Sequence, residues 1–259
     1  MFEDFLKEVK VTHSENTYKT YKANLSYFKG ITPDDILEFI ENSQDKVSTV
    51  TIKKRLVILG TYLKWLGGDH SKALKIIAKY KDVKVKKDCP PDKAIEFILD
   101  YAKSFRDKVI ILLITQGGLR VSEVSNLNMS DVKPQSITLR DTKNHTTVEQ
   151  IVPKGLVKEI YKYINEERLQ TDKDALFTTK NGRISVRTIQ QTIAALFDYV
   201  GYKGFTVHSL RRYYCNTLLS HNVNLAIVQE AMRHKSITST QTYCNITEEQ
   251  IKSAIKEIW

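Results

Sequence analysis

The segment Lys81-Asp-Val-Lys-Val-Lys-Lys-Asp-Cys-Pro-Pro91 divides the sequence into two regions of different character. It is rich in lysine, lacks the apolar spacing that marks a helix, and ends in two prolines, which disfavour helix. We predict a basic linker over residues 83–91, an N-terminal domain over residues 1–82 and a second domain over residues 92–259. A chain of 259 residues is long enough for two such domains, each with its own core.

Upstream of the linker, the sequence predicts a bundle of helices joined by short turns. Apolar residues recur at helical spacing in this region. Thr32 is expected to cap the second helix and Ser48 the third, which Gly67-Gly68 ends. The predicted helices span Ser14–Phe28, Asp34–Glu41, Thr49–Leu66 and Ser71–Tyr80.

The third of these helices carries positive charge on the face opposite its apolar stripe. Lys53, Lys54 and Arg55 lie there, and we expect them to be solvated. For any single lysine, a position on a charged, solvated surface without a binding role is a sufficient explanation. Residues 1–87 hold 17 Lys and Arg against 11 Asp and Glu, and the remainder 23 against 19, so the N-terminal part is the more basic per residue. The net charge of +10 points to a polyanionic partner such as nucleic acid.

Other patterns argue against a membrane, a metal and a disulfide framework. No apolar run reaches the roughly 18 to 20 residues that span a bilayer, and the longest, Val109–Thr115, predicts a buried helix. The N-terminus does not resemble a signal peptide, so we expect a cytoplasmic protein. Cys89, Cys215 and Cys244 form no C-x-x-C pair, and the histidines show no H-x-x-x-H spacing, so neither a disulfide framework nor a metal site is expected.

Downstream of the linker, the sequence predicts further helices around a small sheet. The β-prone segments Ser136–Arg140 and Thr147–Val152 flank a polar turn and predict an antiparallel hairpin, with Asp131-Val132 a candidate start of the first strand. The fold class is therefore mostly α, with a small antiparallel sheet in the second domain. The predicted helices span Lys93–Ala102, Arg106–Gln116, Gly155–Glu167, Val186–Val200, His208–His221, Asn224–Met232 and Thr247–Ile258.

Gly117-Gly-Leu-Arg120-Val-Ser-Glu123 is the first of three stretches with candidate chemistry. Arg120 begins a predicted helix, and Glu123 lies one turn farther on. Two interpretations stay open for Arg120. It forms a surface salt bridge with Glu123, or it binds an anion while Glu123 orients it.

The second stretch, His208-Ser-Leu-Arg211, places a histidine and an arginine on one face of a predicted helix. Histidine titrates near neutral pH, so His208 is suited to accept or return a proton. A histidine followed by an arginine at this spacing is common in unrelated proteins. It therefore indicates a function only together with the other two stretches.

The third stretch begins at Met232-Arg-His234 and reaches Tyr243, nine residues after the histidine. His234 either interacts with the negative end of a helix or takes part in chemistry. Tyr243 is one of 13 tyrosines, most of which we expect to be packing residues, so its case rests on its position. At the predicted hairpin tip, Lys143 is a candidate general acid, with His145 a weaker rival and a solvated lysine the alternative.

The three stretches in this order resemble the motif boxes of the tyrosine recombinases, the integrase and Xer-like family. The resemblance covers nearly the whole chain and is strongest from Gly117 to Tyr243. It implies a helical core-DNA-binding domain, then a mainly helical catalytic domain with a small antiparallel sheet and a C-terminal exchange helix. The implied function is site-specific recombination of double-stranded DNA, in Xer-like resolution or in integration and excision of a mobile element.

The same resemblance implies how the protein works with its partners. A homotetramer, monomeric or weakly dimeric when free, would act on two DNA sites without metal or nucleotide cofactor. Two alternatives stay open, a type IB topoisomerase-like relaxing enzyme and a DNA-binding protein of the same fold without catalysis.

Roles for single residues also follow from the resemblance. Tyr243 would be the nucleophile that forms a 3′-phosphotyrosyl link. Lys143 would protonate the leaving oxygen, His208 would assist proton transfer, and Glu123 would position the site. Arg120, Arg211 and His234 would stabilise the transition state. Candidates for DNA contact are Lys53, Lys54, Arg55, Lys84, Lys86, Lys87, Arg212 and Arg233.

Two features depart from the family pattern. Met232-Arg-His234 stands where the family usually has Leu-Gly-His, so Arg233 either adds a phosphate contact or tightens the turn differently. The predicted hairpin lacks the usual glycine-lysine-glycine run around Lys143. The helix after Tyr243 is amphipathic, and it either packs on its own domain or, by resemblance, docks into a neighbouring subunit.

Overall fold

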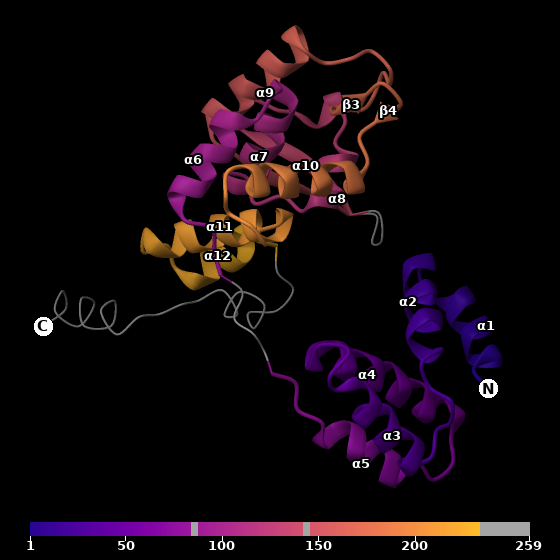
Figure 1. Cartoon of the computed structure of the whole chain (residues 1–259). Helices are drawn as coiled ribbons and strands as arrows, with labels where there is room; N and C mark the ends of the chain where they lie inside the picture. The colour runs from indigo at the N-terminus through magenta and orange to yellow at the C-terminus, as the bar shows by residue number, and fades with distance from the viewer. Residues whose placement is uncertain (84–87, 142–145, 234–259) are drawn as a thin grey trace, which may run out of the picture. The chain divides into compact units, whose positions relative to one another are not determined.

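The protein consists of two compact units, Met1–Lys87 and Asp88–Trp259 (Figure 1). The structure, a computed structural model, describes residues 1–83, 88–141 and 146–233. The division between the units falls inside segment 83–91, where the sequence predicts a linker.

The described part of the first unit is a helical bundle organised around its longest helix, α4. This helix contacts α1, α2 and α5 and completely buries Ile52, Leu56 and Leu59. The helix α1 was not predicted, since no side chain caps its start and it buries only Phe5 and Val9. The helices are α1 (Glu3–Thr12), α2 (Glu15–Leu25), α3 (Pro33–Ser43), α4 (Thr49–Leu66) and α5 (Ser71–Lys79).

Local capping fixes the ends of these helices as the sequence predicts. The Thr32 hydroxyl accepts the Asp35 N–H at 3.2 Å while the Asp35 carboxylate accepts the Thr32 N–H at 2.9 Å, forming a capping box. Ser48 caps α4 by accepting the Thr51 N–H at 3.3 Å. Gly67 ends α4 with a φ of 73°, a backbone conformation that favours glycine.

In the second unit, the buried helix α7 supports the elements around it. Ile111, Leu113 and Ile114 on α7 are completely buried, and α8, α9, α10 and α11 all contact this helix. The buried helix predicted over Val109–Thr115 is therefore confirmed. The helices are α6 (Asp92–Tyr101), α7 (Phe105–Thr115), α8 (Val121–Asn126), α9 (Lys154–Glu166), α10 (Val186–Tyr199), α11 (Val207–Ser220) and α12 (Leu225–Ala231).

The predicted hairpin is present as β1 (Ser136–Asp141) and β2 (Thr146–Ile151), which pair antiparallel. The candidate strand start at Asp131-Val132 is wrong. Asp131 ends a short 3-10 helix, and its buried carboxylate accepts a hydrogen bond from Arg140 Nη1 at 2.7 Å. A second pair, β3 (Thr178–Thr179) and β4 (Gly182–Arg183), was not predicted, because strands of two residues carry no alternating pattern.

Replacing Gly118 should destabilise the second unit. Its φ is 62°, and an added Cβ would lie 2.4 Å from the Tyr214 ring. We expect Gly118→Ala to lower the free energy of unfolding by roughly 2–4 kcal/mol, because backbone strain and overpacking combine. Gly155→Ala is the control, since its Cβ would meet nothing within 4 Å. Denaturant unfolding measures both variants, and equal stabilities would contradict the expectation.

Candidate active site

The turn between α7 and α8 sets the position of Arg120. Gly118 adopts the left-handed backbone conformation, with a φ of 62°, which glycine reaches without strain. Across the turn, the Leu119 N–H donates to the Leu113 carbonyl at 3.3 Å, a bond that closes the end of α7. Arg120 is then the N-cap residue, directly before α8.

Glu123 holds both the backbone and the side chain of Arg120. Its Oε2 accepts the Arg120 N–H at 2.7 Å, and its Oε1 accepts from Arg120 Nη1 at 2.8 Å. The Glu123 side chain is only 17% exposed, whereas that of Arg120 is 43% exposed. The expected salt bridge is therefore confirmed, and the same contacts orient the guanidinium, as the second interpretation of Arg120 requires.

The helix α11 supplies the second arginine. Thr206 caps this helix, and the Thr206 N–H donates to the Ser209 hydroxyl at 3.1 Å. Arg211 is buried, and its Nη2 donates to the carbonyl of Met232. His208, one turn earlier, is exposed.

The turn after α12 joins both arginines. Arg120 Nη2 donates to the Arg233 carbonyl at 3.0 Å, next to the Met232 carbonyl that Arg211 binds. Arg233 itself has a φ of 51°, and its Nη2 donates to Glu123 Oε2 at 2.6 Å. Residues from three distant parts of the sequence are therefore bonded to one another at this turn.

Tyr214 borders the same cluster from α11. Its ring lies against Gly118, as the close approach of a Cβ built there shows. Burial raises the pKa of the Tyr214 hydroxyl, and the charges of Arg233 and Arg211 oppose that shift. The close contact of Tyr214 with Gly118 was not predicted from the sequence.

The arrangement suits the binding of an anion with a tetrahedral or more highly coordinated centre. In the described residues, the guanidinium groups of Arg120 and Arg233 bind the Glu123 carboxylate, and that of Arg211 binds the adjoining Met232 carbonyl. Planar guanidinium groups make charge-assisted bonds to phosphate oxygens and stay protonated. Held rigidly, they stabilise negative charge that develops during a reaction.

Comparison with known proteins identifies the family. The model of the phage integrase family matches residues 91–250, which is more than half of the chain. This chain belongs to the phage integrase family of tyrosine recombinases. The resemblance found in the three sequence stretches is thereby confirmed.

Curated relatives of this recombinase carry the same family name. Tyrosine recombinase XerA of Pyrococcus horikoshii is 29% identical over 260 residues, with 94% of this chain and 88% of the relative covered. Tyrosine recombinase XerD of Oceanobacillus iheyensis is 29% identical over 282 residues, covering 96% and 95%. A solved lambda integrase dimer bound to a COC′ core site has a similar fold, with a TM-score of 0.76, 13% identity and 93% of both chains covered.

Several predicted site residues of the recombinase lie outside the described residues. They include the candidate nucleophile, the candidate general acid with its rival, and the C-terminal helix. These are Lys84, Lys86, Lys87, Lys143, His145, His234, Tyr243 and residues 247–259. Their predicted roles stay predictions. His234, however, directly follows the turn to which both described arginines are bonded.

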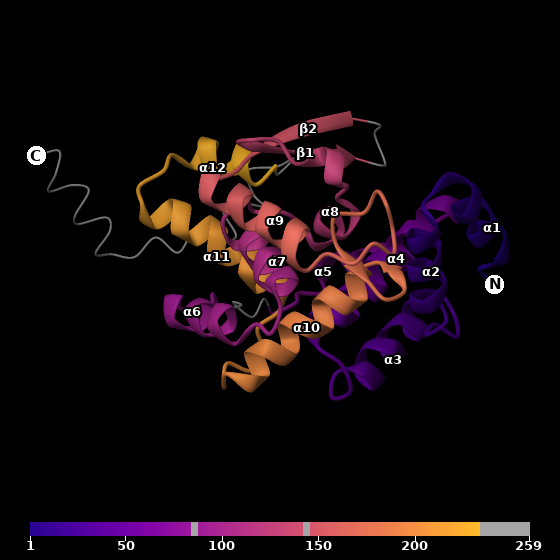
Figure 2. The same cartoon turned by 90° about the horizontal axis from the view of Figure 1, so that it is seen from above.

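The hairpin of β1 and β2 is attached to the end of α12, directly before the same turn. Gln150 on β2 is buried, and its Nε2 donates to the Ala231 carbonyl at the end of α12, at 3.4 Å. Figure 2 shows the two strands at one edge of the unit with the end of α12 beside them. Sequence reasoning missed Gln150, because an inward-facing glutamine in a short strand has no distinctive pattern.

The predicted DNA-binding side chains of the first unit differ in their surroundings. Lys53 Nζ donates to the carbonyls of Ile77 and Tyr80, at 2.9 and 2.6 Å, so it closes the end of α5. Lys54 is exposed. The expectation that Arg55 is solvated is wrong, because this side chain is 8% exposed and stacks on Tyr27 with Cζ 3.4 Å from the ring centroid.

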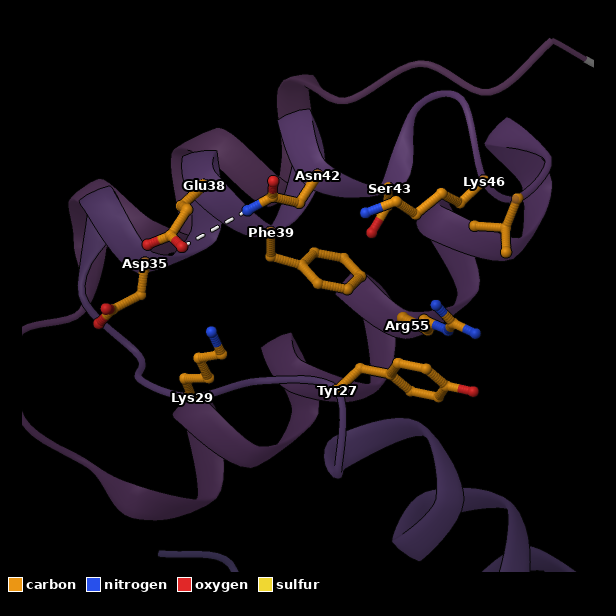
Figure 3. A pocket seen from close by; sticks show the side chains of 10 residues that line it. Tyr27, Lys29, Asp35, Glu38, Phe39, Asn42, Ser43, Lys46 and Arg55 are labelled. Carbon is orange, nitrogen blue, oxygen red and sulfur yellow. Dashed lines mark hydrogen bonds between the residues drawn. The ribbon is translucent and has the colours of Figure 1, made fainter.

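Figure 3 shows the hollow into which Arg55 faces. Two lysines, Lys29 and Lys46, and two carboxylates, Asp35 and Glu38, line this hollow with it, together with Phe39 and other residues. Arg55 Nε is buried and has no hydrogen-bond partner among the described residues.

In the second unit, Arg212 is only partly exposed. Its Nη1 donates to the Asp88 carbonyl at 2.9 Å.

The described residues show neither a cluster of metal ligands nor a membrane-spanning helix. Within the described ranges, no group of three or more His, Cys, Asp or Glu residues could hold a metal ion. No helix in the part of the chain that the structure describes is long and apolar enough to span a bilayer.

Removing the charge of Glu123 should destabilise the second unit. Glu123→Gln takes a carboxylate away from Arg120 and Arg233, so we expect the free energy of unfolding to fall by roughly 2–3 kcal/mol. Glu96→Gln is the control, because Glu96 is exposed on α6 of the same unit, where solvent screens its charge. Chemical denaturation compares the two, and an equal or larger loss in the control would refute the central role of Glu123.

Proposed function

We propose that this recombinase breaks and rejoins double-stranded DNA at specific sites through a covalent intermediate on Tyr243. The observation that carries the proposal is the turn at Met232–Arg233. Arg120 and Arg211, from two separate sequence boxes, each donate a hydrogen bond to its carbonyls. The next residue along the chain is His234, from the third box.

The proposed reaction is a transfer of one phosphodiester bond. The Tyr243 oxygen attacks the phosphorus, a bond forms to the 3′-phosphate, and the bond to the 5′ oxygen breaks. His208 assists removal of the tyrosine proton, and Lys143 donates a proton to the 5′ oxygen that leaves. The phosphotyrosyl ester retains the energy of the broken bond, so attack by a 5′-hydroxyl reseals the strand without a nucleotide or metal cofactor.

The arginines supply electrostatic stabilisation in this scheme. During the attack, negative charge grows on the non-bridging oxygens of the phosphate. Arg120, Arg211 and His234 neutralise this charge, while Glu123 keeps Arg120 in place. Because protein contacts already hold Arg120 and Arg211, little reorganisation is needed when the phosphate binds.

The active assembly in this proposal is a homotetramer on two DNA sites, formed in the cytoplasm from monomers or weak dimers. Tetramer formation couples cleavage at the two sites, with the C-terminal helix as the connecting element between protomers. The alternatives, a relaxing topoisomerase or a DNA-binding protein without catalysis, have no observation of their own in their favour.

The first unit contributes DNA affinity in this proposal. Lys54 is exposed, and Arg55 presents a buried cation to a hollow that Lys29 and Lys46 also line. Arg55 Nε has no hydrogen-bond partner among the described residues, and because an unpaired buried donor is costly, a DNA phosphate that bonded it would stabilise the cation. The linker lysines Lys84, Lys86 and Lys87, together with Arg212, are further candidates for backbone contacts, and Lys53 stays a weaker one.

The nucleophile can be tested by covalent capture. Nicked duplexes with a randomised core should form a covalent complex with the unsubstituted chain, because loss of the short fragment beside the nick prevents resealing. Tyr243→Phe should abolish this complex while leaving DNA affinity unchanged, and sequencing the captured DNA identifies the preferred site. A covalent band that persists in Tyr243→Phe would reject Tyr243 as the nucleophile.

The role of Arg55 can be tested by the salt dependence of DNA binding. For Arg55→Met we expect the slope of log affinity against log salt to become shallower by about one, the effect of one lost phosphate contact. Arg168→Met is the control, since Arg168 is equally buried and its guanidinium bonds carbonyls of its own unit, and it should lower the melting temperature without altering the slope. An unchanged slope in Arg55→Met would assign Arg55 to packing on Tyr27 alone.

A further inference from the structure

Arg233 occupies a backbone conformation that normally belongs to glycine. It follows the end of α12, and its φ of 51° lies in the left-handed region. For a residue with a Cβ, this conformation costs on the order of 1–2 kcal/mol, and helices commonly end there with glycine instead. The strain points to a compensating interaction of the Arg233 side chain.

That interaction is with the residue that orients Arg120. Arg233 Nη2 donates to Glu123 Oε2 at 2.6 Å, and it also approaches the Gly118 carbonyl at 3.4 Å. The side chain is only 12% exposed. Burial lowers the pKa of the Arg233 guanidinium, and the Glu123 carboxylate opposes that shift.

The contacts of these residues form a closed ring. Glu123 binds Arg233 through Oε2 and the Arg120 guanidinium through Oε1. Arg120 Nη2 then donates to the Arg233 carbonyl at 3.0 Å, which completes the ring. Both terminal nitrogens of Arg120 are therefore fixed by protein groups, so its guanidinium plane has one preferred orientation.

We propose that Arg233 is a positioning residue for strand cleavage, acting on Arg120 through Glu123. This inference rests on the proposed function and assigns Arg233 a different role from the DNA contact predicted from its sequence. A bare glycine at this position would leave Glu123 bound to Arg120 alone. Arg233 adds a second cation to the carboxylate and locks the turn before His234 to the start of α8.

A direct phosphate contact is the competing explanation. Arg233 Nε and Nη1 are buried and have no hydrogen-bond partner among the described residues, so they are the groups that such a contact would use. A positioning residue changes the rate of cleavage on bound DNA, whereas a phosphate ligand changes affinity and its salt dependence. The two roles therefore predict different measurements.

The test compares Arg233→Gly, Glu123→Gln and the double variant. Glycine accepts the left-handed backbone, so Arg233→Gly removes the guanidinium without adding strain. At saturating concentrations of the duplexes captured by the unsubstituted chain, we expect single-turnover cleavage by Arg233→Gly to slow roughly 10- to 100-fold. Its dissociation constant and salt slope should stay unchanged. The double variant should cleave within about twofold of the slower single variant, because both changes break one ring.

Conservative substitution separates positioning from a general loss of structure. Arg233→Lys keeps a cation for Glu123 and should recover part of the cleavage rate, whereas Arg233→Asn, which tolerates the left-handed conformation, should behave like Arg233→Gly. A salt slope lowered by about one in Arg233→Gly would instead establish a phosphate contact and overturn the proposal. The proposal would also be overturned if the fold losses in cleavage rate of the two single variants multiplied in the double variant. An unaltered cleavage rate in Arg233→Gly would overturn it as well.

The outcome also separates this inference from the function on which it rests. If the unsubstituted chain forms no covalent complex, the proposed function fails and the role of Arg233 fails with it. If the unsubstituted chain forms the complex and Arg233→Gly matches its rate, only the positioning role is rejected.

Discussion

The carboxylate of Glu123 is the contact on which the arrangement of the candidate active site depends. It accepts hydrogen bonds from the backbone of Arg120 and from the guanidinium groups of Arg120 and Arg233. Without this negative charge, two guanidinium groups would face each other at the edge of a low-dielectric core, where repulsion between like charges is strong. The carboxylate binds both guanidinium groups, which offsets their repulsion and fixes their positions.

The elements that meet at this carboxylate are positioned by the buried core beneath them. The apolar helix α7 contacts both α8, which carries Glu123, and α11, which carries Arg211. Gly118 allows the ring of Tyr214 to approach the turn between α7 and α8 closely. The core therefore determines which helix ends come together, and the charged residues determine their final orientation.

Sequence reasoning succeeded where the signal is local. The capping box at Thr32 and the end of α4 at Gly67 depend on residues within one helical turn, and the family resemblance depended on short ordered stretches. It failed for Arg55, because the partner of its guanidinium is Tyr27, on another segment of the bundle. A charged residue on a helix is usually solvated, and nothing in the neighbouring residues indicates a stacking partner far along the chain.

Arg233 illustrates the same limit within the candidate site. From the sequence it was visible as a departure from the family pattern, but the two interpretations, a phosphate contact or a different turn, could not be separated. The structure places its side chain on Glu123, 110 residues earlier in the chain, which no local pattern encodes. Helix periodicity reports which face of an element is buried, whereas the pairing of one charge with another depends on how the elements pack.

The candidate site uses some of its hydrogen-bond donors internally, and this has a consequence for the proposed reaction. Arg120 gives one N–H group to Glu123 and another to the Arg233 carbonyl, and Arg211 gives one to the Met232 carbonyl. Fewer donors then remain for a phosphate, which weakens binding of the ground state. The remaining donors are held in fixed directions, so they can match an oxygen arrangement that arises only as the phosphorus becomes five-coordinate.

Binding that is stronger in the transition state than in the ground state is what accelerates a reaction. The internal hydrogen bonds of the two arginines therefore favour a rigid catalytic site over a tight phosphate-binding one.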